Sequence, residues 1–262
     1  RYIMLLLSVL LFACGSPAPE KKKEVSVTKP AKPKILFVCS NISAVDGKPN
    51  GTFLSEIAVP FIKFQEAGYL IDVVSPLGGK VPVYYKFDTT EVIARALESK
   101  YYQQKIANSM KPQQIRPKEY GAVIIPGGYS QFWDVQIDEP IKGIIAQVHE
   151  QGGVVGSLGH GTSSLVNVLL SSGKYLVQGK TMTCFPSWFE KEVMTEADYG
   201  KLLPFDMEEG LRMRGANLKP AQKGSIDDSE VVDEEHRIVT ASMATSGDFI
   251  FNQIHRLLNS NE

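Results

Sequence analysis

Residues 153–168 read GVVGSLGHGTSSLVNV, and this stretch decides the fold. Its apolar run, Val154–Leu158, predicts a short buried strand, and the helical pattern of Thr162–Leu170 predicts a helix with a hydroxyl residue capping its start. The turn between them, Gly159-His160-Gly161, is flanked by glycines. A strand, a sharp turn and a helix form a nucleophile elbow, which lifts one side chain above a sheet in a strained conformation. The central position of this elbow is Gly159.

Strands and helices alternate on both sides of the elbow, which predicts an α/β fold: a doubly wound, mostly parallel, flavodoxin-like sheet with helices on both faces. We expect one domain over 34–258, with a small cap insertion at about 81–117. In such sheets ligands bind at the carboxyl ends of the strands. Apolar runs indicate strands at 35–39, 70–75, 122–125, 154–158, 179–183 and 238–241, and helical periodicity indicates further helices at 52–67, 89–107, 141–151, 205–214 and 247–258.

The first residues have the pattern of a targeting segment. Residues 1–13 predict a signal peptide, because their apolar run is too short to span a membrane. The run ends Leu11-Phe12-Ala13-Cys14, which resembles a bacterial lipobox, so Cys14 is the expected lipidation site. Residues 14–33 are rich in Pro, Lys, Glu, Ser and Thr and predict a disordered tether. A plain secretory signal cut near Ala13, or an uncleaved anchor, is the alternative.

This segment predicts a membrane-anchored lipoprotein of the bacterial cell envelope, on its periplasmic or extracellular face.

The composition of the chain argues against several kinds of partner and site. The net charge of −1 argues against a nucleic-acid partner. Besides Cys14, the two cysteines, Cys39 and Cys184, are too few for a disulfide framework, and we expect both to be free and buried. The four histidines are scattered, so no metal site and no cofactor is expected.

Three further motifs occur in order along the chain: Lys48-Pro49-Asn50-Gly51 followed by Glu56, then Ser75-Pro76-Leu77-Gly78-Gly79, then Pro126-Gly127-Gly128 followed by Trp133-Asp134. Together with the elbow, they resemble the DJ-1/PfpI superfamily of class I glutamine amidotransferase-like proteins. Within it, they are most similar to the branch of heat-shock chaperones and glyoxalase III enzymes. The resemblance covers essentially the whole predicted domain.

The resemblance implies roles for individual residues. The family's Cys-His-Gly falls on Gly159-His160-Gly161, so the nucleophilic cysteine is absent and Gly159 marks its position. The family's carboxylate falls on Glu56, and its proton-transferring histidine falls on His160. The backbone around Gly127, Gly128 and Gly161 corresponds to the oxyanion and binding region, with the amides of Gly128 and His160 as the expected donors.

Each of these residues also has an ordinary interpretation. Glu56 lies in an apolar helix segment, where a carboxylate is costly unless it is paired, but it could also face solvent. His160 could be a packed or surface-turn histidine. Ser157 and Thr162 flank the elbow without occupying it, so neither replaces the thiol.

Glycine adopts the strained elbow conformation freely, so the loss of cysteine relaxes the fold while removing the nucleophile. We therefore expect a protein without thiol chemistry that binds a small carbonyl compound, a peptide or a partner protein, and a homodimer is compatible with the resemblance. The competing hypothesis is an active glyoxalase III-type, deglycase or hydrolase-like enzyme in which Glu56 and His160 act as general base and acid.

Overall fold

A computed structural model describes residues 32–84, 90–192, 201–224 and 229–260. The predicted signal peptide and nearly all of the tether, Cys14 included, lie outside the described residues. The elements are β1 Lys34–Val38, β2 Ala44–Val45, β3 Lys48–Pro49, β4 Thr52–Phe53, α1 Leu54–Glu66, β5 Ile71–Val74, β6 Val83–Tyr84, α2 Glu91–Glu98, α3 Lys100–Ala107, η1 Pro112–Gln114, η2 Pro117–Glu119, β7 Tyr120–Ile125, η3 Tyr129–Phe132, η4 Val135–Ile137, α4 Glu139–Glu150, β8 Val154–Leu158, η5 Gly159–Leu165, β9 Thr181–Met182, α5 Ser187–Glu192, α6 Met207–Met213, β10 Asn217–Leu218, β11 Glu230–Asp233, β12 Ile238–Ala241 and α7 Gly247–Asn259.

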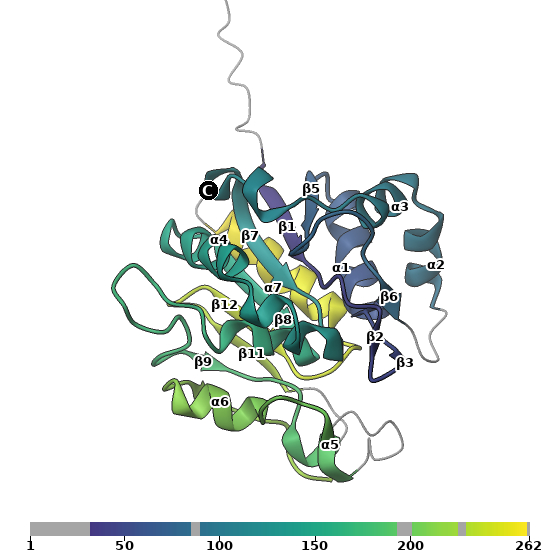
Figure 1. The fold of residues 1–262 in the computed structure, drawn as a ribbon. Coiled ribbons are helices and arrows are strands. Elements are labelled where there is room, and N and C mark those ends of the chain that lie inside the picture. Colours follow the sequence, from purple (N-terminus) through teal and green to yellow (C-terminus); the bar gives the residue numbers. More distant parts are fainter. Residues whose placement is uncertain (1–31, 85–89, 193–200, 225–228, 261–262) are drawn as a thin grey trace, which may run out of the picture. The chain divides into compact units, whose positions relative to one another are not determined.

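The core is a six-stranded sheet in the order β11-β12-β8-β7-β1-β5 (Figure 1). All pairings are parallel except that of β11 with β12. Helices α1 and α7 pack on one face of the sheet, and α4 packs on the other. The predicted doubly wound, mostly parallel sheet is therefore confirmed. The central strands are buried on both faces, as their continuous apolar runs predicted.

Several helices begin or end differently from the sequence prediction. The helix expected at 89–107 is two helices, because Ser99 adopts an extended conformation and its hydroxyl caps α3 by accepting from the amide of Tyr102. These helices belong to the predicted cap insertion, where α2 packs on α1 and α3 contacts β5. The strand expected at 179–183 forms as β9, but it pairs with β10 in a separate two-stranded sheet.

The elbow helix also differs from its prediction. The sequence pattern indicated a capped helix over Thr162–Leu170, but the structure has the 3-10 helix η5 with no side-chain cap. The Thr162 hydroxyl is instead hydrogen-bonded to the Ser157 hydroxyl of β8 at 2.8 Å. It therefore ties the turn to the strand rather than capping a helix.

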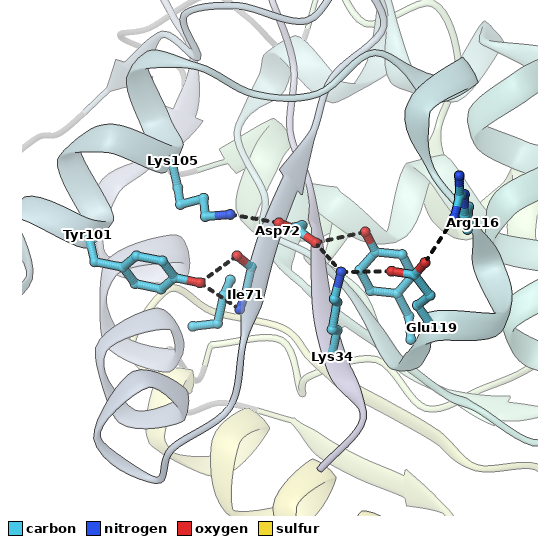
Figure 2. A network of polar contacts seen from close by, with 8 residues as sticks. Lys34, Ile71, Asp72, Tyr101, Lys105, Arg116 and Glu119 are labelled. Atoms are coloured by element: carbon cyan, nitrogen blue, oxygen red, sulfur yellow. Dashed lines mark hydrogen bonds and ion pairs between the residues drawn. The ribbon is translucent and has the colours of Figure 1, made fainter. Parts of the chain in front are cut away.

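A charged network joins the amino ends of β1, β5 and β7 (Figure 2). Asp72 accepts hydrogen bonds from Lys105 at 2.6 Å and from the Tyr120 hydroxyl at 2.9 Å, and it lies 3.5 Å from the Lys34 ammonium. Burial alone would raise the pKa of Asp72, but these three partners outweigh it and lower the pKa. The network stabilises the end of the sheet opposite to the carboxyl ends, which leaves the carboxyl ends for the predicted site.

Candidate active site

The elbow forms where β8 ends. Gly159 directly follows Leu158, begins η5 and has a φ of +49°. Residues with a β-carbon rarely adopt this left-handed conformation, whereas glycine does so at little cost. The predicted turn between strand and helix is therefore present at Gly159, and its positive φ is the strained conformation expected of an elbow.

Glu56 is buried in the first turn of α1, with 5% of its surface exposed. Its Oε2 accepts a hydrogen bond from the Gly127 amide at 2.6 Å, which compensates part of the cost of burying a carboxylate. The carboxylate faces the elbow, because a β-carbon placed on Gly159 would lie 3.0 Å from Oε1 and 3.3 Å from Oε2. The solvent-facing interpretation is thus wrong, and the carboxylate itself occupies the space beside Gly159.

The glycines after β7 and at the elbow form a tightly packed backbone cradle, which we define as Gly127, Gly128 and Gly161. Gly128 has a φ of +118°, and a β-carbon there would collide with the carbonyl oxygen of Gly51. A β-carbon on Gly161 would collide with the carbonyl oxygen of Ile125. Close backbone approach therefore requires glycine at these positions.

Two amides of this region are available as donors. In the described part of the chain, neither the Gly128 nor the His160 amide donates a hydrogen bond to another residue. The Gly127 amide, in contrast, is engaged by Glu56. The Gly128 and His160 amides are the pair that the resemblance implied as donors to an oxyanion.

His160 is buried and held by a carboxylate that the sequence analysis did not identify. Its Nε2 lies 2.8 Å from Oε2 of Glu190 on α5, and the Tyr129 hydroxyl donates to Oε1 of the same carboxylate at 2.5 Å. Burial alone would raise the pKa of Glu190, but His160 and the hydrogen bonds from His160 and Tyr129 outweigh it and lower the pKa. Glu190 therefore remains an anion that orients the imidazole of His160. Because His160 is buried, its interpretation as a surface-turn histidine is wrong.

Two aromatic rings pack against the imidazole of His160, one from η3 and one from the segment between β9 and α5. The rings of Tyr129 and Phe185 each lie 4.3 Å from the His160 ring between centroids, at an interplanar angle of 31°. Since Nε2 is held by Glu190 and no hydrogen bond among the described residues uses Nδ1, Nδ1 is the nitrogen left for a ligand.

A cavity of about 130 Å³ opens beside His160. Glu56 and Gly159 do not line it, so a ligand in the cavity meets the imidazole and Glu190 first. Its lining residues are Phe132, His160, Phe185, Ser187, Glu190, Lys191, Leu203, Phe205, Asp206 and Met207.

Neither remaining cysteine replaces the elbow thiol. Cys39 and Cys184 are free and fully buried, as predicted. Burial raises the pKa of Cys39 to about 12 and raises that of Cys184 well above the usual range. A thiol must ionise to act as a nucleophile, so both are inert core residues.

No group of three or more metal-ligating side chains is found among the residues that the structure describes, and none of their helices is long and apolar enough to cross a bilayer. Metal and cofactor requirements therefore remain at the level of the sequence prediction.

The assembled groups are those of acid–base and carbonyl chemistry: a buried carboxylate, an oriented imidazole and two amides without a partner among the described residues, arranged around a strand-to-helix turn.

This combination defines an α/β domain with an elbow-type site that has a glycine, Gly159, at its central position. The pattern of the DJ-1/PfpI family matches residues 49–255, and the chain belongs to that family. Its relatives include the glutathione-independent glyoxalase hsp3102 of Schizosaccharomyces pombe, 29% identical over an alignment of 153 residues that covers 53% of this chain and 62% of that protein. The chain thus matches less than two thirds of the length of that relative.

Solved structures show the same fold. The Rapid Encystment Protein 24 KDa (REP24) of Francisella tularensis superposes with a TM-score of 0.75 at 24% identity, covering 86% of this chain and 99% of that one. Glyoxalase III from Candida albicans superposes with a TM-score of 0.70 at 22% identity, covering 86% of this chain and 95% of that one.

Glu190 and Tyr129 are the site residues that the sequence analysis missed. Glu190 follows His160 by 30 residues and lies on a helix of only six residues, Ser187–Glu192, too short for a clear periodic signal. Tyr129 directly follows the glycine pair of a motif that was identified, so its place beside the site could have been inferred from that motif.

Proposed function

We propose that this chain binds small carbonyl compounds without forming a covalent bond to them. The observation that carries the proposal is Gly159 at the centre of an otherwise complete elbow site. The amides of Gly128 and His160 can hold a carbonyl oxygen, and Glu190 keeps the imidazole oriented. The relatives that are glutathione-independent glyoxalases support a carbonyl ligand for this chain. The small volume of the cavity favours a small molecule over a peptide.

The proposal includes anchoring to the bacterial cell envelope through a lipid on Cys14, with residues 14–33 as the tether. It rests on the lipobox-like end of the apolar run in the first residues. In this arrangement the domain binds its ligand at the periplasmic or extracellular face of the membrane.

A second candidate function is catalysis by the remaining groups, and the intact contact between His160 and Glu190 favours it. Glu56 would act as general base and His160 as general acid on a carbonyl compound or a water molecule. Such an enzyme would add one water molecule to the aldehyde carbon of an α-oxoaldehyde, move the hydrogen of that carbon as a proton to the neighbouring carbon, and release an α-hydroxy acid with no covalent thiol intermediate.

A methylglyoxal assay on the full chain separates the two candidates. We expect calorimetry to show that methylglyoxal binds, and we expect no lactate to form. The His160→Ala variant should weaken binding, whereas Leu169→Ala, at an exposed position outside the site, should not. Lactate formation by the parent that is lost in both His160→Ala and Glu56→Gln would establish the enzyme instead, and absence of binding of both methylglyoxal and benzaldehyde would refute the proposal.

A further inference from the structure

The cavity beside His160 has a mainly apolar lining. Side chains of Phe132, Phe185 and Phe205 line it together with Leu203, and the imidazole of His160 is one of its polar groups. Phe132 packs against Phe205 with ring centroids 5.1 Å apart, and it lies 6.0 Å from the His160 ring. These residues come from η3, the segment after β9 and the segment before α6, so one partly open, mainly apolar surface is assembled from distant parts of the chain.

The volume of this cavity matches an aromatic ring. An apolar cavity of about 150 Å³ in a protein core is large enough to bind benzene, and the cavity here is about 130 Å³. A methyl group would leave most of that volume unfilled, so the aromatic walls would lack partner atoms and the associated dispersion energy. A ring or a branched alkyl group of similar size would contact all of the walls.

The charges at the cavity compensate each other. The Lys191 ammonium lies 2.6 Å from the Asp206 carboxylate, and the Lys191 side chain is 66% exposed. The Glu190 carboxylate is engaged by His160 and by Tyr129. Because each charged group already has its partner, the cavity offers no unpaired charge to an ionic ligand.

We infer that the carbonyl ligand of this protein is a neutral aldehyde or ketone that carries an apolar group of about the size of a phenyl ring. The apolar group fills the space between Phe132, Phe185 and Phe205, and the carbonyl lies at the His160 edge of the cavity. This inference rests on the proposed carbonyl-binding function, to which it adds the class of ligand.

The experiment measures binding of three neutral probes to the full chain by calorimetry: benzaldehyde, propanal and toluene. Benzaldehyde should bind at least tenfold more tightly than propanal, because burial of each additional carbon contributes to affinity. It should also bind at least threefold more tightly than toluene, which has the ring but no carbonyl group. Equal affinities for benzaldehyde and propanal would overturn the inference while leaving the carbonyl-binding function in place.

Other outcomes separate the inference from the function it rests on. Equal binding of toluene and benzaldehyde, with none of propanal, would confirm a ring-sized site but refute carbonyl recognition, and with it the full inference. No binding of any probe would refute both.

Two variants test the location of the site. Leu203→Trp should fill the cavity and abolish benzaldehyde binding, and Leu169→Trp, at an exposed position outside the cavity, is the matched control. Phe205→Ala should instead enlarge the cavity and improve binding of naphthaldehyde relative to benzaldehyde. Because the two variants change the cavity in opposite ways, either one still tests the location if the other fails to fold. Unchanged affinities in the folded variants would place the ligand elsewhere and overturn the inference.

Discussion

The variant Gly159→Cys places the family's cysteine at the elbow, and it tests most directly the hypothesis that Gly159 occupies the position of the nucleophile. The β-carbon would be forced into a left-handed conformation with a φ of +49°, which costs about 1–3 kcal/mol for a residue other than glycine. It would also lie 3.0 Å from Oε1 of Glu56, so the carboxylate must shift by a few tenths of an ångström. That shift weakens the 2.6 Å hydrogen bond from the Gly127 amide.

The two effects together predict a loss of about 2–4 kcal/mol in the free energy of unfolding, since a hydrogen bond to a charged group contributes about 1.5–3 kcal/mol and is only partly lost. For a chain of this size, each kcal/mol lowers the melting temperature by about 2–4 °C. Thermal unfolding should therefore show a decrease of roughly 4–16 °C. The Gly159→Ala variant adds the same β-carbon without sulfur, so it should lose similar stability.

The new thiol should differ from the two native ones in reactivity. The Glu56 carboxylate beside it can take up the thiol proton, and the amides of Gly128 and His160 favour the resulting thiolate, whereas the pKa values of Cys39 and Cys184 are raised by burial. Oxidation by peroxide, followed by mass spectrometry, should therefore modify the new cysteine first. We also expect methylglyoxal turnover above that of the parent and of Gly159→Ala.

Two results would refute the reasoning. A thiol at this position that reacts no faster than Cys39 would show that the pocket has been remodelled beyond one residue. A parent protein as active as the variant would show that the chemistry uses other groups. An unchanged melting temperature in Gly159→Ala would contradict the strain argument alone.

Three further changes test other parts of the structure and of the proposed anchoring. Cys14→Ser should release the protein from membranes, because each buried CH₂ of an acyl chain contributes about 0.8 kcal/mol, and an unchanged membrane fraction in cell fractionation would contradict lipid anchoring. Glu190→Gln should lower stability at neutral pH: the folded-state pKa of Glu190 is lowered, so its contribution is present above the unfolded pKa near 4.5 and is lost as pH falls through the folded pKa. The difference from the parent in chemical denaturation should therefore shrink at acidic pH, and a constant difference would argue against an ionised carboxylate. Gly128→Ala should destabilise the fold by more than Gly152→Ala, since a β-carbon meets the Gly51 carbonyl at the first position and open space at the second, and both positions have a positive φ.

Much of the sheet could be predicted because its strands are continuous apolar runs. Val154–Leu158 and the glycines after it correctly located the elbow, and α1, Leu54–Glu66, lies within the helix expected at 52–67. The strand β11 was missed, because Glu230–Asp233 is short, only partly buried and pairs antiparallel at the edge. Its few residues carry no strong hydrophobic pattern.

The site was only partly predictable for a related reason. Gly159, His160 and Glu56 belong to local motifs, so their proximity followed from the resemblance and from the shared carboxyl edge of the strands. The contact of His160 with Glu190 depends on how the chain after β9 returns across the site, which no local pattern specifies. The cavity walls likewise come from segments that meet only in the folded chain.

The tightly packed cradle around the elbow has a consequence for the ancestry of the protein. Gly128 and Gly161 are held by backbone contacts that tolerate no side chain, whereas the space beside Gly159 is limited only by the end of the Glu56 side chain. Selection for folding alone therefore preserves glycine at these two positions, whether or not the elbow position carries a thiol. Glycine and cysteine codons can differ by a single base, so one point mutation at Gly159 is enough to place a thiol in this preserved cradle.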